Sequence, residues 1–381
     1  MHRWFLRFLV GFFLLNGCFT MTAAQEVSLK QKIGQMLIIG FKGMELKPDD
    51  AVTRAILAQQ IGGVILFDWD YQTKTYHHNI QSPKQLSSLT QQLQAYANQA
   101  ANTHKNNLTP LFISIDYEGG VVNRLKEHYG FPKTISAEEI GKGSKEQAYH
   151  YAQQMAETLK NNGINMNFAP LVDVNLNPTN PIIGGKQRSF SSDPKDVTNY
   201  AAIFSKAYDD QGILCAYKHF PGHGSSTGDT HAGFVDVTAT WKEEELIPYD
   251  QLLRQPTHCP IIMTAHVVNY KLDEKGYPAS ISKAITTGLL REKLNFDGVV
   301  VTDDMQMKAI ADHYGLKEAI KLAINAGVDI LIFGNQLSLT WQDPQEIIDI
   351  IYQSVMDNEI SERRIDEAYQ RVMKLKGKLS K

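Results

Sequence analysis

Residues 218–231, with the sequence KHFPGHGSSTGDTH, hold the densest group of side chains in this chain that could do chemistry. Three histidines, one lysine and one aspartate fall within these fourteen residues, with three glycines and a proline among them. Glycine and proline at this density favour a loop over a helix. The loop directly follows an apolar run at 212–217, which is typical of a buried strand. Polar loops that follow buried strands carry the catalytic groups of many α/β enzymes.

Polar side chains also end other apolar runs of the sequence. The residues in these positions are Asp116, Lys218, His219, His266 and Asp303. A single such residue could be a helix cap or a satisfied polar group. If the runs are parallel strands of one barrel, however, all their carboxyl ends meet at one face. We therefore expect these five side chains to surround one pocket.

Eight apolar, β-rich runs alternate with helical patterns along the chain. They lie at 36–40, 61–67, 111–115, 166–172, 212–217, 260–265, 298–302 and 328–333. The runs are continuous, as strands buried on both faces require. This pattern predicts a single (β/α)₈ TIM-type barrel over residues 25–381, without a second α/β domain. The alternative is an open doubly wound sheet, but no glycine-rich phosphate fingerprint follows the first run.

The first 24 residues differ from the rest in composition. A short basic start precedes an apolar run at 8–15, and small residues follow through Ala24. The run is too short to span a bilayer, and the whole is typical of a secretory signal peptide. Cleavage after Ala24 is one interpretation. The alternative is cleavage before Cys18 in a lipoprotein-like box, which would lipidate Cys18 and attach the protein to a membrane. An uncleaved anchor is the third. We expect export to the periplasm or cell envelope in each case.

Net charge and cysteine content bear on the partners of the protein and on the state of its thiols. The net charge is −3 over 381 residues and there is no basic tract, so a nucleic-acid partner is not indicated. Cys215 and Cys259 both lie in apolar runs. Buried free thiols are the interpretation that this placement favours, because cysteine is among the most often buried residues. A disulfide is the alternative in an oxidising compartment.

Three kinds of site could use the polar residues of the loop. A metal site could draw on His219, His223, Asp229 and His231, but they fall in an expected loop and not on a helix that would place two ligands on one face. Lys218 would also repel a cation. We therefore predict neither a metal nor an organic cofactor. The remaining two kinds are a carbohydrate hydrolase and a sugar-binding module without catalysis.

A hydrolase needs a carboxylate to attack the anomeric carbon and an acid to protonate the leaving oxygen. Asp303 could be the first. A histidine whose tautomer is held by an aspartate could be the second, and Asp229 and His231 supply such a pair. The glycines between Lys218 and this pair, Gly222 among them, are expected to let the pair move over the substrate.

The same residues resemble the signature of glycoside hydrolase family 3, in its β-N-acetylglucosaminidase branch. Residues 218–224 (KHFPGHG), followed by Asp229 and His231, carry the resemblance most specifically. Similar motifs occur at 116–124 (DYEGGVVNR), 188–191 (RSFS), 298–305 (GVVVTDDM) and 363–368 (RRIDEA), so the likeness extends from about residue 30 to about 378. Val121 is a departure, since several relatives carry arginine there.

The resemblance implies an activity and a role for each matching residue. It implies a retaining exo-β-N-acetylglucosaminidase (a β-N-acetylhexosaminidase) that acts on peptidoglycan fragments or chitooligosaccharides. Asp303 would be the nucleophile, His231 the acid/base and Asp229 its orienting partner. The residues implied to bind the terminal N-acetylglucosamine are Asp116, Arg124, Arg188, Lys218 and His219. An arginine that only forms a structural ion pair is the alternative for Arg124. His223 is expected to shape the loop.

Two other functions stay open from the sequence. Some family members with this histidine and aspartate pass the sugar to phosphate, so an N-acetylglucosaminide phosphorylase is one alternative. A non-catalytic envelope lipoprotein that binds cell-wall glycan is the other. In every case the expected partner is a carbohydrate, and we expect a monomer.

Overall fold

The computed structural model describes residues 27–59, 61–103, 109–337 and 341–379. Eight parallel strands form a closed barrel in chain order, and the last strand pairs with the first. The barrel strands are β1 (Leu37–Gly40), β2 (Gly63–Leu66), β5 (Phe112–Ile115), β8 (Met166–Asn167), β9 (Leu214–Phe220), β11 (Ile261–Thr264), β13 (Val299–Asp304) and β14 (Ile330–Phe333). The predicted barrel is confirmed, because an open sheet would leave β1 and β14 unpaired.

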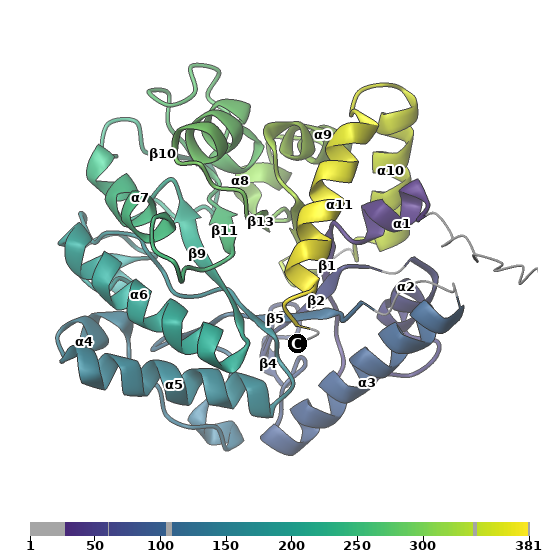
Figure 1. The fold of residues 1–381 in the computed structure, drawn as a ribbon, viewed down its shortest axis with the longest axis horizontal. Coiled ribbons are helices and arrows are strands. Elements are labelled where there is room, and N and C mark those ends of the chain that lie inside the picture. The colour runs from purple at the N-terminus through teal and green to yellow at the C-terminus, as the bar shows by residue number, and fades with distance from the viewer. Residues whose placement is uncertain (1–26, 60, 104–108, 338–340, 380–381) are drawn as a thin grey trace, which may run out of the picture.

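Helices surround the barrel (Figure 1). The longer ones are α2 (Ala51–Gln59), α3 (Pro83–Thr103), α5 (Lys145–Asn161), α6 (Pro194–Gln211), α9 (Leu316–Ala326), α10 (Pro344–Met356) and α11 (Glu362–Lys376). The shorter ones are α1 (Leu29–Gly34), α4 (Ala137–Gly141), α7 (Ile247–Leu253), α8 (Lys308–Ala311) and a π-helical segment at Ala284–Lys293. Helices α1, α10 and α11 pack together, so the first and last described segments lie on the same side of the barrel.

Local sequence signals begin several of these helices. Ser144 precedes α5 and forms a capping box with Gln147. Asp193 precedes α6, where its carboxylate accepts from the backbone N–H of Lys195, and Pro194 is the first helical residue. These caps place the helices that cover the strands next to the polar loop.

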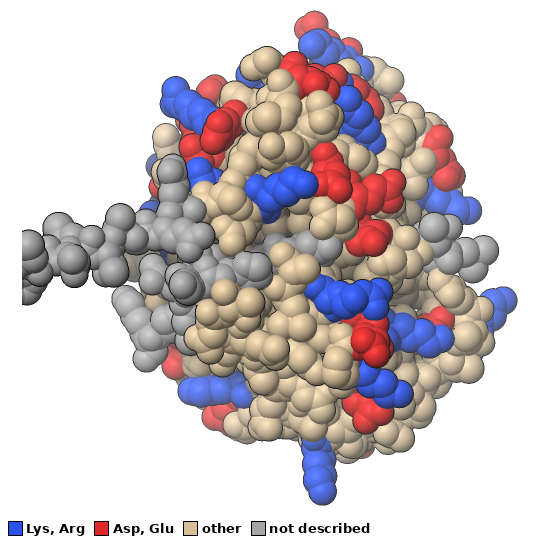
Figure 2. Space-filling view, turned by 90° about the vertical axis from the view of Figure 1, so that its right-hand side faces the viewer, with Lys and Arg blue, Asp and Glu red and all other residues tan. Residues whose placement is uncertain are grey.

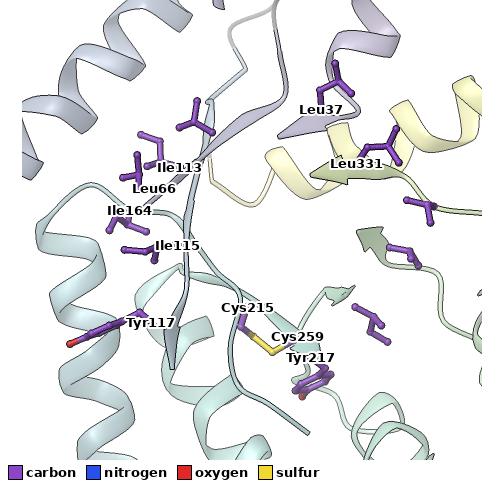
Figure 3. Close-up of a cluster of buried hydrophobic side chains, with 14 of the residues drawn as sticks. Leu37, Leu66, Ile113, Ile115, Tyr117, Ile164, Cys215, Tyr217, Cys259 and Leu331 are labelled. Carbon is purple, nitrogen blue, oxygen red and sulfur yellow. A yellow bond between two sulfur atoms is a disulfide. The ribbon is translucent and has the colours of Figure 1, made fainter. Parts of the chain in front are cut away.

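The strands are mostly apolar before their carboxyl ends because both of their faces are buried. Ile38 and the inward-facing residues of the other strands fill the barrel interior. Their neighbours pack against the helices in a larger outer cluster, in which Leu37, Ile113 and Leu331 come from three different strands (Figure 3). Burial on both faces explains why the runs are almost entirely apolar, and the buried exceptions Ser114 and Asn167 donate hydrogen bonds to backbone carbonyls.

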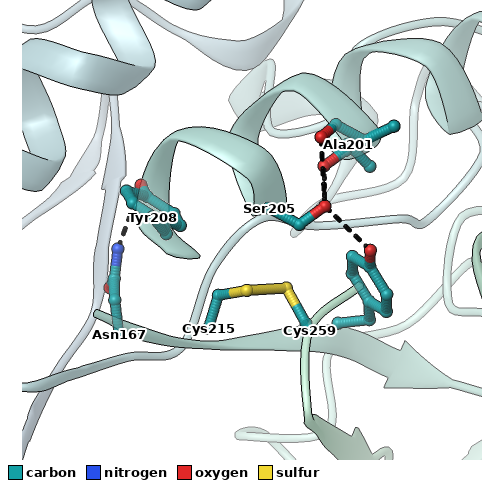
Figure 4. Close-up of a disulfide and its surroundings, with 8 residues drawn as sticks. Asn167, Ala201, Ser205, Tyr208, Cys215 and Cys259 are labelled. Carbon is teal, nitrogen blue, oxygen red and sulfur yellow. Dashed lines mark hydrogen bonds between the residues drawn. A yellow bond between two sulfur atoms is a disulfide. The ribbon is translucent and has the colours of Figure 1, made fainter. Parts of the chain in front are cut away.

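Cys215 and Cys259 form a disulfide, so the prediction of buried free thiols was wrong (Figure 4). Cys215 lies in β9, and Cys259 lies just before β11, which pairs with β9. This pairing brings the two Cα atoms to 4.9 Å although 44 residues separate the cysteines in the chain. Neither apolar run by itself indicates which strands become neighbours, and only the barrel order does.

The surface on the side of α1, α10 and α11 carries acidic and basic side chains interspersed (Figure 2). Within the described ranges, no helix has both the length and the apolar character needed to cross a membrane. The predicted signal peptide at 1–24 and its Cys18 lie outside the described residues.

Lys376, the last residue of α11, is a lysine buried against the barrel, and its effect on stability can be tested. It is 2% exposed, and its Nζ lies 4.8 Å from the centroid of the Phe112 ring. Burial lowers the pKa of Lys376 to about 7, with no contribution from a carboxylate of the described chain. Below that pH the buried amine is charged in the folded state, which costs stability. This cost decreases as the pH rises above 7, because the folded protein then releases the proton of Lys376 while the unfolded chain still binds it.

We therefore expect Lys376→Met to raise the free energy of unfolding at pH 6 by about 1–3 kcal/mol. The gain should shrink steadily between pH 7 and pH 9. Urea unfolding at a series of pH values measures both quantities. Lys374→Met, which removes an exposed lysine of the same helix, should change stability little at any of them. A gain that is the same at every pH would contradict the buried charge.

Candidate active site

A cavity of about 270 Å³ opens at the carboxyl ends of the barrel strands. Seven of the eight predicted site residues line it: Asp116, Arg124, Arg188, Lys218, His219, His231 and Asp303. The eighth, Asp229, contacts His231. Of the five strand-end residues expected around one pocket, Asp116, Lys218, His219 and Asp303 line it, because β5, β9 and β13 all end at this face.

A buried network of charges forms the inner part of the cavity. Lys218 Nζ lies 2.7 Å from Asp116 Oδ1 and 2.8 Å from Glu118 Oε1. Arg188 donates two parallel hydrogen bonds to Glu118, of 2.8 Å from Nε and 2.7 Å from Nη2. Such bidentate pairs fix both orientation and charge. Arg124 Nη2 lies 3.5 Å from Asp116 Oδ2 and completes the network.

The groups of this network are ionised near neutral pH. Burial raises the pKa of Glu118, but Arg188 and Lys218 outweigh it and lower the pKa to about 2. Burial also opposes ionisation of Asp116, and Lys218 and Arg124 together hold its pKa below the ordinary value. Burial disfavours the charged Lys218, yet the two carboxylates raise its pKa. Fixed donors thus alternate with fixed acceptors, a pattern that can bind the hydroxyl groups of a sugar.

Asp173 orients the next part of the cavity. It is fully buried, its Oδ2 lies 2.7 Å from His219 Nδ1, and its Oδ1 accepts from the backbone N–H of His223 at 2.8 Å. Burial opposes its ionisation, but His219 outweighs that effect and the pKa of Asp173 is lowered. An ionised carboxylate at Nδ1 makes that nitrogen the donor, so the imidazole of His219 presents Nε2 on its other side.

The base of the 218–231 loop is packed against a second buried carboxyl group. Glu245 accepts from the backbone N–H of Gly224 at 2.9 Å and from Ser225 Oγ at 2.5 Å. Burial raises the pKa of Glu245 to about 7. Gly222 has φ +120°, and a Cβ added there would lie 2.5 Å from Glu245 Cβ. Gly222 is therefore required for close packing, and replacing it would not isolate the loop movement expected from the sequence.

Asp229 and His231 form the predicted pair on the outer part of the loop. Asp229 Oδ1 lies 2.8 Å from His231 Nδ1 and accepts from the backbone N–H of His231 at 2.9 Å. The hydrogen bond from His231 lowers the pKa of Asp229 to about 2, against the opposing effect of burial. Because Nδ1 donates to a carboxylate, Nε2 is the nitrogen that can exchange a proton with a bound molecule.

Asp303 and His231 shift each other's protonation in opposite directions. Burial raises the pKa of Asp303, but the histidines His266, His219 and His231 outweigh it, so the net pKa is lowered. Burial lowers the pKa of His231, but Asp229 and Asp303 outweigh it, so the net pKa is raised. The cavity therefore holds an ionised carboxylate and a histidine that keeps its proton to higher pH than usual. A nucleophile and a proton donor need these two states.

His266 supports this arrangement without lining the cavity. Its Nε2 lies 3.0 Å from the carbonyl oxygen of Asp304, and its Nδ1 lies 2.7 Å from Ser280 Oγ. Since a carbonyl oxygen only accepts, Nε2 carries the hydrogen and Nδ1 accepts from Ser280. His266 thus fixes the backbone beside Asp303. The prediction that it belongs to the pocket lining was wrong, because its ring turns to the backbone next to the pocket.

The metal site considered from the sequence is not assembled. The rings of His219 and His223 lie 6.0 Å apart, and His219 and His231 each contact their own aspartate. Across the described parts of the chain, no three His, Cys, Asp or Glu side chains converge as a metal would require.

Sequence reasoning missed three carboxyl groups of the site, and two of them had a signal. Glu118 lies inside the 116–124 motif, and Asp173 ends the apolar run at 166–172, as the five predicted strand-end residues end theirs. Glu245 is one of three successive glutamates and has no signal that separates it from its exposed neighbours.

Comparison with known proteins places this site in a family. The family model described as "Glycosyl hydrolase family 3 N terminal domain" matches residues 28–375. The chain is 33% identical over 394 residues to "Beta-hexosaminidase A" of Pseudoalteromonas piscicida, covering 94% of this chain and 62% of the relative. It is 34% identical over 307 residues to "Beta-hexosaminidase" of Tolumonas auensis, covering 78% and 82%.

A solved structure is similar over the whole barrel. It is a glycoside hydrolase family 3 β-N-acetylglucosaminidase from Paenibacillus sp. str. FPU-7, with a TM-score of 0.82, 33% identity and coverage of 93% of this chain and 63% of that chain. The chain spans less than two thirds of the length of this protein and of the Pseudoalteromonas relative. These matches confirm the resemblance noted from the motifs: the chain belongs to glycoside hydrolase family 3.

The contact between Asp229 and His231 predicts a measurable shift in pKa. Asp229→Asn removes the negative charge that favours the imidazolium, so the pKa of His231 should fall by about one unit or more. A titration of the imidazole resonances by NMR measures it. The matched control is Asp236→Asn, since Asp236 also accepts from a backbone N–H two residues later but contacts no histidine. An unchanged pKa of His231 in Asp229→Asn would contradict the pairing.

Proposed function

We propose that this family 3 chain is a retaining exo-β-N-acetylglucosaminidase. It would release terminal non-reducing N-acetylglucosamine from peptidoglycan fragments or chitooligosaccharides. One observation carries the proposal: Asp303 and His231 line the same cavity, with Asp229 bonded to His231 at 2.8 Å. The names of the family relatives, which are hexosaminidases and an N-acetylglucosaminidase, support the sugar.

The first step of the proposed reaction uses both catalytic groups at once. An oxygen of the Asp303 carboxylate attacks the anomeric carbon while His231 Nε2–H gives its proton to the leaving oxygen. The glycosidic bond breaks, a covalent glycosyl-enzyme forms and the leaving sugar departs as an alcohol. His231 is left neutral, and the carboxylate of Asp229 holds its Nδ1–H so that Nε2 stays directed at the reaction centre.

The second step reverses these roles. Neutral His231 takes a proton from an incoming water molecule, whose oxygen attacks the anomeric carbon. The bond to Asp303 breaks and N-acetylglucosamine leaves with its original β configuration, because two inversions have occurred. A histidine suits this task, since it titrates near neutral pH and adds no negative charge beside the nucleophile.

The buried charge network supports an exo mode of action. Asp116, Glu118, Arg188 and Lys218 occupy the inner part of the cavity and are themselves bonded to one another. A chain end can reach such a group of donors and acceptors, whereas an uninterrupted chain would have to pass through it. These residues would bind hydroxyl groups of the terminal sugar, with Arg124 and His219 beside them.

We also propose that the protein is exported and acts in the periplasm or cell envelope. The signal-peptide pattern of residues 1–24 supports this, and so does the disulfide between Cys215 and Cys259, because disulfides persist mainly in oxidising compartments.

Asp303→Asn tests the proposed reaction. The neutral amide is a far weaker nucleophile, so turnover of chitobiose and of an aryl β-N-acetylglucosaminide should fall by about 10³-fold or more. Asp357→Asn, at an exposed aspartate outside the cavity lining, should retain wild-type rates. Proton NMR of the wild-type reaction should show the β-anomer first. Undiminished activity of Asp303→Asn would overturn the assignment, and phosphate-dependent release of a sugar 1-phosphate would replace the hydrolase with a phosphorylase.

Expression with the complete N-terminus in a Gram-negative host tests export. Mass spectrometry of the purified protein should find a mature chain that begins at Gln25 or at a lipidated Cys18. Replacing Cys18 with serine should abolish the lipid mass only in the second case. A chain that keeps Met1 and stays in the cytosol would contradict the proposal.

A further inference from the structure

Two exposed apolar side chains lie at the mouth of the cavity. Tyr71 is 56% exposed and Val121 is 63% exposed, yet both line the same cavity as Asp303 and Lys218. We propose that Tyr71, together with Val121, binds the leaving-side sugar through the apolar face of its pyranose ring. The inference rests on the proposed function and extends it to the part of the substrate that departs.

The position of the acid determines which end of the cavity receives the leaving sugar. His231 must contact the leaving oxygen, and about half of its side chain is exposed, whereas Lys218 is almost fully buried. The terminal sugar therefore occupies the inner, charged part, and the leaving sugar lies on the solvent side of His231. Tyr71 and Val121 are lining residues of that outer part.

The backbone around Tyr71 is held in place by its neighbours. Tyr71 follows β3 (Trp69–Asp70), which pairs with β4 (Thr75–Tyr76) in a short hairpin. The Asp70 carboxylate lies 2.5 Å from Lys42 Nζ and accepts from the backbone N–H of Gln72 at 2.9 Å. The Trp69 carbonyl accepts from Gln336 at 2.5 Å, which joins the hairpin to the segment after β14. The ring of Tyr71 is thus presented to solvent from an ordered turn.

A second contact joins this hairpin to the segment that carries Val121. Lys126 Nζ lies 3.3 Å from Asp68 Oδ2 and 5.2 Å from the centroid of the Tyr76 ring. Val121 lies between β6 (Tyr117–Gly119) and β7 (Val122–Asn123), a few residues before Lys126. The two apolar side chains therefore come from two segments that are bonded to each other.

The chemistry of the two side chains indicates the ligand. A pyranose with equatorial substituents has an apolar face of axial C–H groups, and an aromatic ring provides a flat apolar partner for it. Because the hairpin that carries Tyr71 is ordered before a ligand binds, binding loses less conformational entropy. Such a surface favours a ligand that lies flat against it. A β-linked N-acetylhexosamine fits this description.

The experiment compares two substrates that differ only in what leaves. Chitobiose has a leaving sugar that reaches the mouth, whereas in N-acetylglucosaminyl azide the leaving group is too small to do so. In Tyr71→Ala, the ratio of kcat/KM for chitobiose to kcat/KM for the azide should fall at least fivefold. Tyr71→Phe keeps the ring and should restore the ratio. Tyr270→Ala removes a tyrosine of similar exposure, 47%, outside the cavity lining and should leave the ratio at the wild-type value.

Each outcome bears on one of the two proposals. An unchanged ratio in Tyr71→Ala would overturn the platform and leave the proposed function standing. A wild-type protein that cleaves the azide but not chitobiose would also overturn the platform, because the mouth would then accept no leaving sugar. A wild-type protein that cleaves neither substrate would overturn the proposed function and the platform with it.

Discussion

The buried ammonium of Lys218, held between the carboxylates of Asp116 and Glu118, is the interaction on which the inner cavity depends. An ion removed from water loses several kcal/mol of solvation, and only close, well-oriented partners offset that loss. Arg188 in turn neutralises Glu118 through two parallel hydrogen bonds. The network is therefore stable as a whole and costly to break at any one member, which makes its donors and acceptors rigid.

In the outer part of the cavity, Asp303 and His231 shift each other's pKa. The carboxylate of Asp303 raises the pKa of His231, and His231 contributes to lowering the pKa of Asp303. Each group thereby stabilises the charged form of the other. Asp229 adds to the first effect and also fixes the tautomer. Lys218 and His219 thus lie at the end of β9, whereas Asp229 and His231 lie in the loop that follows this strand, so the expected loop begins after Phe220.

Two buried carboxyl groups outside the reaction hold that loop in place. Asp173 is bonded to His219 and to the backbone of His223, and Glu245 is bonded to Gly224 and Ser225. The loop is consequently tied down at its base, while Asp229 and His231 lie further along it and are more exposed. One segment thus combines a rigid, buried base with a more exposed outer part.

The sequence by itself determined the barrel and, of the eight predicted site residues, the seven that line the cavity and Asp229, which contacts His231. Continuous apolar runs indicate burial on both faces of a strand, and polar residues at the ends of the runs indicate the face at which the cavity opens. Both signals are local. The disulfide, the pairing of Glu118 with Arg188, and the contacts of Asp173 and Glu245 were decided only by the tertiary structure. Those partners are between 20 and 70 residues apart. Their contact depends on which strands and loops become neighbours when the barrel closes, and no local pattern carries that information.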